Sequence, residues 1–263
     1  MTRHLLDLSI VVPAYNEEIR LEPTLRSYLG YFRGGGQAFE LIVVDDGSID
    51  GTTPIAERVG TEFAELRLIR LAENRGKGYA VRSGVVNARG RLVLFADADG
   101  ATPPSEFERL HAAVSAGADV AIGSRVLRTD GVAVRARLHR RLIGRAFHAL
   151  VRLCGVHDIA DTQCGFKLFR GPVAHALFSR MRTSGFSFDV EVLMMARLCR
   201  CRIAEVPINW VHQPGSRINL VTDSVRMAWE LLLIRARRQR GDYTVPHVAP
   251  WTAPPGPARA VAL

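Results

Sequence analysis

Two aspartates separated by one residue, Asp97 and Asp99, directly follow an apolar run at residues 91–96. In extended backbone, side chains two positions apart point to the same side, so both carboxylates can reach one cation. Hard divalent ions such as Mg²⁺ and Mn²⁺ take carboxylate oxygens and often bridge substrate phosphates. The pair predicts a Mg²⁺ or Mn²⁺ site that neutralises a departing diphosphate. Two loop aspartates that cap a helix are the alternative.

A second acidic pair, Asp45 and Asp46, ends the apolar run at residues 39–44. Neighbouring residues of a strand point to opposite faces, so one carboxylate can face a ligand while the other braces a loop. The ligand-facing carboxylate can accept hydrogen bonds from a base N–H or from ribose hydroxyls. A helix cap is the alternative, and for Asp45 taken alone it is the preferred interpretation.

The glycine-rich segment Asn74-Arg-Gly-Lys-Gly78 resembles a phosphate-cradling loop before a helix N-terminus. Its spacing is not that of a Walker A motif. We expect Lys77 to reach a phosphate group. A solvated lysine in a flexible loop remains the alternative.

All these residues follow predicted strands, which the apolar runs place at residues 8–13, 39–44, 66–71, 91–96 and 118–123. Helical patterns lie between them, at 17–31, after the glycine-rich segment to about residue 88, and from Pro103 and Pro104 onward. Strands that alternate with helices favour parallel βαβ units, in which ligands bind at the carboxyl ends of the strands. The four aspartates would therefore share one edge of the sheet.

The second half of the chain shows a different pattern. We expect helices at 138–153, 186–198 and 220–239, a strand toward the end of 161–169, and another at 202–210. We predict one domain over residues 1–243, with a nucleotide-binding part at 1–125 and an acceptor part at 126–243. Residues 244–263, rich in Pro and Ala, are expected to be disordered.

Composition limits the classes of partner. The 263 residues are 48% hydrophobic, which allows a substantial core. The net charge of +9 favours an anionic partner such as nucleic acid, a phosphorylated substrate or a membrane surface, although a basic background composition is an equal explanation. No nucleic-acid-binding module is recognisable and acidic strand ends oppose a polyanion, so we expect no nucleic acid partner. The 4 cysteines form no C-x-x-C pair and are expected to be free thiols.

Free thiols fit the cytoplasm, and neither a signal peptide nor an apolar stretch of about 18 residues is apparent. We therefore predict a cytoplasmic protein without a membrane span. The helix at 220–239 is apolar on much of its surface and ends in a basic run, so it could lie on the anionic inner face of the cell membrane. A core-packing helix with a basic last turn is an equal alternative. Trp210 and Trp229 are expected in the core.

Four segments occur in a fixed order, each after a predicted strand: Pro13-Ala-Tyr-Asn-Glu-Glu18, Asp45-Asp-Gly-Ser48, Asn74-Arg-Gly-Lys-Gly78 and Asp97-Ala-Asp99. The set resembles the inverting GT-A-fold nucleotide-sugar glycosyltransferases of family 2. The resemblance implies an α/β GT-A fold, Rossmann-like, with a mostly parallel sheet and helices on both faces. It also implies a nucleotide-sugar donor, with Asp97 and Asp99 holding the metal and diphosphate. Base and ribose would be held by Pro13, Ala14, Tyr15, Glu17, Asp45 and Asp46.

Further segments, Gly123-Ser-Arg125, Arg140-Arg141 and Asp161-Thr-Gln-Cys-Gly-Phe-Lys167, look like the polyprenyl-phosphate branch of that family. Within the branch, residues 97–102 and 161–169 look like dolichyl-phosphate β-glucosyltransferases. The resemblance implies transfer of a hexose, glucose from UDP-glucose, to polyprenyl or dolichyl phosphate. GDP-mannose as donor, or a soluble sugar or metabolite as acceptor, are the alternatives. Many relatives carry transmembrane anchors, whereas none is predicted here.

A lipid phosphate is already an oxyanion at neutral pH, so it needs nearby cations more than a strong base. Arginine gives bidentate phosphate contacts, and the candidates are Arg125, Arg140, Arg141 and Arg217. A solvated helix face is the alternative for the Arg140–Arg141 pair.

Three further residues belong to the predicted acceptor side. Asp161 would orient the acceptor loop or bind sugar hydroxyls, or simply shape a turn. Lys167 would pair with Asp161 or with phosphate. For a soluble acceptor, Asp161 or Asp189 would serve as the base.

Overall fold

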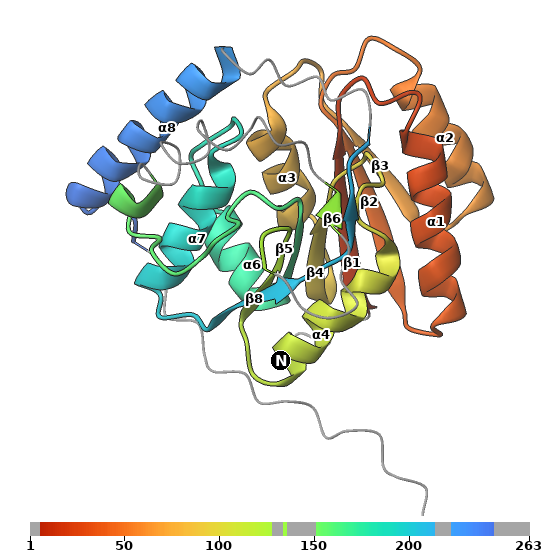
Figure 1. Ribbon diagram of the computed structural model, residues 1–263. Coiled ribbons are helices and arrows are strands. Elements are labelled where there is room, and N and C mark those ends of the chain that lie inside the picture. The colour runs from red at the N-terminus through yellow and green to blue at the C-terminus, as the bar shows by residue number, and fades with distance from the viewer. Residues whose placement is uncertain (1–5, 128–133, 136–150, 214–221, 245–263) are drawn as a thin grey trace, which may run out of the picture.

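The computed structural model describes residues 6–127, 134–135, 151–213 and 222–244. Its centre is a sheet with helices on both faces (Figure 1). Some predictions lie outside the described residues: those on Arg140, Arg141 and Arg217, most of the helix at 138–153, and the tail from residue 245 onward.

The sheet has seven strands in the order β3-β2-β1-β4-β7-β5-β8. The first four in this order are parallel, as expected, while β7 runs antiparallel between β4 and β5. The sheet is therefore mostly parallel, which confirms the predicted fold class. The strands are β1 (Leu6–Ala14), β2 (Phe39–Asp45), β3 (Leu66–Arg70), β4 (Gly90–Ala96), β5 (Val120–Ser124), β7 (Phe166–Arg170) and β8 (Ile203–Pro207).

One face of the sheet is covered by α1 (Leu21–Gly34), α2 (Thr52–Glu62) and α4 (Phe107–Ser115), with the short 3-10 turn η1 (Pro104–Glu106) before α4. The other face carries α3 (Lys77–Val86), α6 (Gly171–Phe178), α7 (Phe188–Leu198) and α8 (Thr222–Gln239). A separate two-stranded sheet joins β6 (Val134–Arg135) to β9 (Trp210–Val211).

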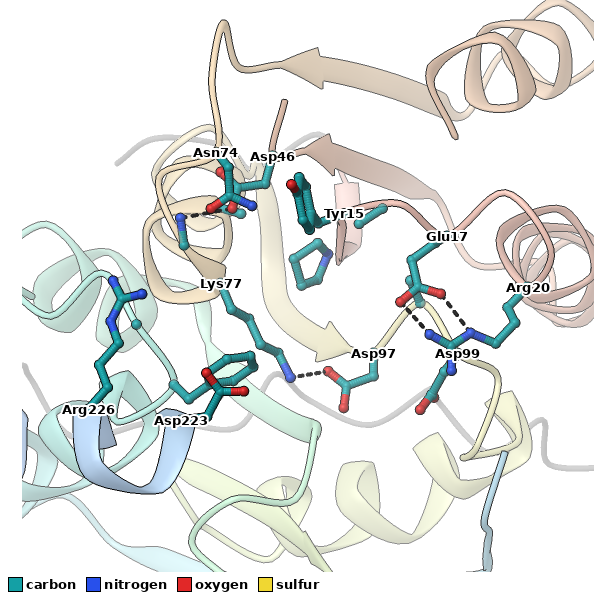
Figure 2. Close-up of a pocket in the computed structure, with 17 residues that line it drawn as sticks. Tyr15, Glu17, Arg20, Asp46, Asn74, Lys77, Asp97, Asp99, Asp223 and Arg226 are labelled. Carbon is teal, nitrogen blue, oxygen red and sulfur yellow. Dashed lines mark hydrogen bonds and ion pairs between the residues drawn. The ribbon is translucent and has the colours of Figure 1, made fainter. Parts of the chain in front are cut away.

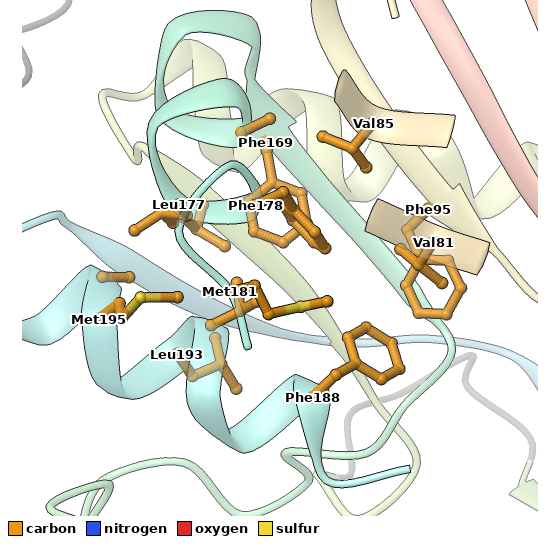
Figure 3. Packing of buried hydrophobic residues seen from close by; sticks show 14 of the residues in the cluster. Val81, Val85, Phe95, Phe169, Leu177, Phe178, Met181, Phe188, Leu193 and Met195 are labelled. Carbon is orange, nitrogen blue, oxygen red and sulfur yellow. The ribbon is translucent and has the colours of Figure 1, made fainter. Parts of the chain in front are cut away.

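The strands under the site are buried on both faces, which explains their almost unbroken apolar sequences. All seven residues of β2 are buried. Two hydrophobic clusters result, one on each face. Figure 3 shows the cluster beneath α3, α6 and α7, where the rings of Phe95 and Phe188 meet edge to face at 5.7 Å. Phe95 is close to the end of β4, so this packing fixes the strand from which Asp97 emerges.

Several local expectations need correction. The helix expected at 17–31 begins at Leu21, which leaves residues 17–20 as a turn that can contribute side chains to the site. Helix α6 was not predicted. Trp229 was expected in the core, and this was wrong, because 61% of its surface is exposed. Only one side of α8 packs inward, through Leu231 and Ile234. No helix among the described residues is long and apolar enough to span a membrane.

Candidate active site

A cavity of about 350 Å³ opens at the carboxyl ends of β1, β2 and β4. Its walls bring together most of the donor-site residues predicted from the sequence, as Figure 2 shows. The predicted residues that line it are Pro13, Ala14, Tyr15, Glu17, Asp46, Lys77, Asp97 and Asp99. Asp45 does not line the cavity and is completely buried behind it.

Asp45 and Asp46 point to opposite sides and have different partners, as expected for adjacent residues at the end of a strand. Asp45 accepts hydrogen bonds from the Ser48 amide, at 2.9 Å, and from the Thr53 hydroxyl, so it braces the loop after β2. Its predicted contact with base or ribose is therefore replaced by the bracing role. Asp46 accepts the amides of Arg75 and Gly76, both at 2.8 Å. Burial raises its pKa above the ordinary value, against these two hydrogen bonds.

Three residues of the glycine-rich segment line the cavity: Asn74, Gly76 and Lys77. Gly76 has a φ of 98°, and a Cβ there would lie 2.5 Å from the carbonyl oxygen of Ser184, so only glycine fits. Amides of the segment already donate to Asp46, and the amide of Tyr79 donates to Ser184 at 3.2 Å. Lys77, the first residue of α3, projects from this fixed backbone into the cavity.

Lys77 lies against the first aspartate of the Asp97–Asp99 pair. Its Nζ is 2.7 Å from Oδ1 of Asp97 and 5.5 Å from the centre of the Phe95 ring. Burial acts to lower the pKa of Lys77, but the negative charges of Asp97 and Asp189 outweigh it and the pKa is raised. Lys77 is therefore a cation at neutral pH.

Asp99 has a cation on its own side. The Arg20 guanidinium donates two hydrogen bonds to Glu17, from Nη2 to Oε1 at 2.6 Å and from Nε to Oε2 at 2.7 Å. It lies beside Asp99 in Figure 2. Burial raises the pKa of Asp99, and the charge of Asp97 adds to this effect. Burial also raises the pKa of Glu17, against its contacts with Arg20. No motif in the sequence marks Arg20.

The aspartate pair has the chemistry of a site for a hard divalent cation. Both carboxylates line one cavity, and the buried Oδ1 of Asp97 is in close ion contact with Lys77. Within the described ranges, no group of three or more His, Cys, Asp or Glu could hold a metal. An ion here would complete its shell with oxygens from outside the chain, such as phosphate and water.

Outside the cavity lining, the structure joins two residues predicted for the acceptor side, Arg125 and Asp161. Nε and Nη2 of Arg125 donate to the two carboxylate oxygens of Asp161 at 2.7 and 2.8 Å, and the Arg125 amide adds a third bond at 2.9 Å. Glu205 fixes the loop by accepting the Ala160 and Asp161 amides. Burial acts to raise the pKa of Asp161, but its bonds with Arg125 prevail and lower it. Asp161 thus orients Arg125, whose guanidinium lies 5.5 Å from the centre of the Trp210 ring.

The expectation for Lys167 is wrong. Its side chain is 1% exposed, and its Nζ contacts Asp189 Oδ1 at 2.5 Å and the Cys164 carbonyl at 2.6 Å. It therefore pairs neither with Asp161 nor with an incoming phosphate. The reason is the antiparallel insertion of β7, which places Lys167 opposite Phe95 inside the sheet. Asp189 is the buried ion-pair partner of Lys167.

The opposite wall of the cavity comes from residues that no sequence motif marks. Asp223 and Arg226 of α8, together with Gly185 and Phe186, line it. Helix α8 is docked there because Glu230 accepts the Ser187 amide at 3.1 Å. No motif marks this wall, because it depends on how α8 packs.

Comparisons with known proteins identify the family of the chain. The model of the family described as glycosyl transferase family 2 matches residues 9–178. The dolichyl-phosphate beta-glucosyltransferase of Saccharomyces cerevisiae is 39% identical over 255 residues, covering 90% of this chain and 76% of the yeast protein. The protein of the same name from Homo sapiens is 38% identical, covering 89% of this chain and 76% of its own.

Solved structures support the fold. Mannosyl-3-phosphoglycerate synthase from Rubrobacter xylanophilus superposes with a TM-score of 0.67 at 20% identity, covering 90% of this chain and 75% of that one. Glucosyl-3-phosphoglycerate synthase from Mycobacterium tuberculosis, in a complex with Mn²⁺, UDP-glucose and phosphoglyceric acid, gives 0.65 at 20% identity, covering 88% and 80%. The chain therefore belongs to glycosyltransferase family 2 and has the GT-A fold.

Proposed function

We propose that this enzyme transfers glucose from UDP-glucose to a polyprenyl phosphate, with inversion at the sugar carbon and with the help of a divalent metal. Relatives named dolichyl-phosphate beta-glucosyltransferase match about nine-tenths of the chain. The observation that carries the acceptor assignment is the Arg125–Asp161 unit, which presents an oriented cation rather than a base.

The donor would lie along the strand ends. Tyr15, Glu17 and Asp46 line the part of the cavity over β1 and β2, where base and ribose would bind. Lys77 and Asp97 line the part over β4, where the diphosphate would bind. A solved structure of the same fold holds UDP-glucose and Mn²⁺ together, which supports this donor class.

Asp97 and Asp99 would hold the metal, Mg²⁺ or Mn²⁺. When bound, such an ion supplies positive charge to the diphosphate as the sugar–phosphate bond breaks. The chain's own part is to keep both carboxylates facing the cavity. The Asp99 carboxylate accepts a hydrogen bond from the Ala101 amide at 3.0 Å. The Asp97 amide donates one to the Gly165 carbonyl oxygen at 3.0 Å.

The acid residues expected to act as a base for a soluble acceptor are unsuited to that role. Both oxygens of Asp161 accept hydrogen bonds from Arg125, and its pKa is lowered, so it holds a proton poorly. Asp189 is buried against Lys167. A phosphate acceptor removes the need for a base, because its oxygen is ionised already. Arg125 would then draw that oxygen toward the sugar carbon.

We also propose that α8 touches the membrane surface from which the lipid would come. Val225, Trp229 and Leu232 are 67%, 61% and 47% exposed and recur at helical spacing on one side of α8. The last turn of α8 is basic, with Arg237 and Arg238. Since α8 also lines the cavity, a surface bound along this side would bring a lipid phosphate near the donor.

The test is a panel of donors and acceptors with purified enzyme and Mg²⁺ or Mn²⁺. We expect UDP release from UDP-glucose only when polyprenyl phosphate is present. GDP release from GDP-mannose with the same lipid would contradict the sugar assignment. Turnover with a soluble sugar or metabolite, and none with the lipid, would contradict the acceptor assignment.

A further inference from the structure

Lys77 contacts the Asp97 oxygen to which a metal would bind. Its Nζ lies 2.7 Å from Oδ1 of Asp97, and this oxygen is buried. The other oxygen, Oδ2, is packed against Gly165, where an added Cβ would lie at only 1.8 Å. Asp97 is thus neutralised through Oδ1, by Lys77.

The Lys77 side chain can leave while its backbone stays fixed. Gly76 and Gly78 are packed against the carbonyl oxygens of Ser184 and Thr183, so the start of α3 has no room to shift. The side chain itself is 26% exposed and lies along the cavity wall. Lysine has a flexible stem and a compact charge, so its ammonium can swing from one anion to another nearby.

We infer that the Lys77 ammonium competes with the metal for Asp97 and moves to the diphosphate when the donor binds. Metal binding and nucleotide binding are thereby coupled. This inference rests on the metal and donor proposed above. An ammonium and a divalent cation in contact with one oxygen would repel each other strongly, so one must leave. A departing ammonium needs another anion, and the diphosphate provides it.

The coupling has a definite direction. Without nucleotide, metal binding breaks the Lys77–Asp97 contact. The other nearby carboxylate, Asp189, is already paired with Lys167, so the ammonium gains no new partner and the metal binds weakly. With nucleotide, the ammonium gains a phosphate partner and both ligands bind more tightly. Linkage requires the effect to be reciprocal, and couplings of this type are typically about 5- to 150-fold.

The experiment measures two affinities of the full-length chain by calorimetric titration: Mn²⁺ alone, and UDP at saturating Mn²⁺. In Lys77→Met, we expect Mn²⁺ alone to bind about fivefold tighter and UDP to bind about tenfold weaker. Lys77→Arg keeps the charge and should keep Mn²⁺ binding near the original value. Arg75→Met removes a charge from the same loop, where Arg75 lies over the Tyr79 ring at 3.8 Å, and should leave both affinities unchanged.

Unchanged or weaker Mn²⁺ binding in Lys77→Met would overturn the inference, as would an equal tightening in Arg75→Met, which would indicate a general charge effect. Failure of the unsubstituted enzyme to bind Mn²⁺ even with UDP would instead contradict the proposed metal site and with it this inference. Thermal melts check the fold of each variant, and Lys77→Gln gives the same comparison if Lys77→Met melts early.

Discussion

Gly165 lies so close to Asp97 that it has no room for a side chain. A Cβ there would meet Asp97 Oδ2 at 1.8 Å and Cγ at 2.1 Å. We expect Gly165→Ala to displace the carboxylate and reduce kcat about 100-fold, since a shift of about 1 Å in a reacting group can cost that much. Steady-state kinetics with the donor and acceptor measures the loss.

The matched control is Gly30→Ala in α1, where nothing lies within 4 Å of an added Cβ. That variant should retain full activity. A Gly165→Ala enzyme as active as Gly30→Ala would show that Asp97 need not occupy its observed position.

The lowered pKa of Asp161 should make the free energy of unfolding depend on pH. Its pKa is lowered in the folded state, so its contribution is complete above the unfolded value of about 3.9 and is lost as pH falls through the folded value. Asp161→Asn should therefore reduce the free energy of unfolding by about 1–3 kcal/mol at pH 7. The difference from the unsubstituted chain should shrink below about pH 4.

Urea unfolding at several pH values measures this difference. Asp158→Asn is the control in the same loop, because its ion pair with Arg197 is exposed and should matter little. A gap for Asp161→Asn that stayed constant from pH 7 to about pH 3 would argue against an ionised Asp161–Arg125 pair.

Among individual residues, the sequence predicts the location of those whose position along a strand decides their role. Asp97, Asp99 and Asp46 follow parallel strands, so their convergence could be predicted. Lys167 could not be placed, because its burial depends on its antiparallel register with Phe95 and on Asp189, which lies 22 positions away in the chain.

Among the elements, α8 forms one wall of the cavity through Asp223 and Arg226. In our proposal, its exposed side also contacts the membrane. Trp229→Ser should weaken binding to vesicles of anionic phospholipid about threefold to tenfold, because it removes a large apolar group from the exposed side of α8. Vesicle sedimentation measures the change.

Val86→Ser, at the end of α3, removes an exposed apolar side chain near the start of β4 rather than its carboxyl end, and should bind vesicles normally. Equal binding by the Trp229 and Val86 variants would contradict a membrane contact through α8. Loss of transfer to a detergent-dispersed lipid in the Trp229 variant would instead point to a role within the cavity.

The sequence predicted most elements well and missed those that depend on distant packing. Apolar runs located β1 to β5 within about two residues, because buried parallel strands carry continuous hydrophobic sequence. The antiparallel placement of β7 and the contribution of α8 to the site were missed. Neither follows from local periodicity, since each depends on contacts between segments far apart in the chain.

At the scale of the whole molecule, we predict a nucleotide-binding part at residues 1–125 and an acceptor part at residues 126–243. Strand β5 ends at Ser124, next to the proposed boundary between the nucleotide-binding and acceptor parts. The cavity nevertheless draws Gly185, Asp223 and Arg226 from the second part. The boundary stays a prediction, and the site uses both sides of it.

The central claim is that Asp97 and Asp99 hold a metal that supports sugar transfer to a lipid phosphate. The most direct measurement is UDP release from UDP-glucose with polyprenyl phosphate, with and without a chelator, for the unsubstituted enzyme and for Asp97→Ala/Asp99→Ala. We predict metal-dependent release by the former and at least a 1,000-fold loss, about 4 kcal/mol of transition-state stabilisation, in the latter. Undiminished release by the double variant in chelator would contradict the account.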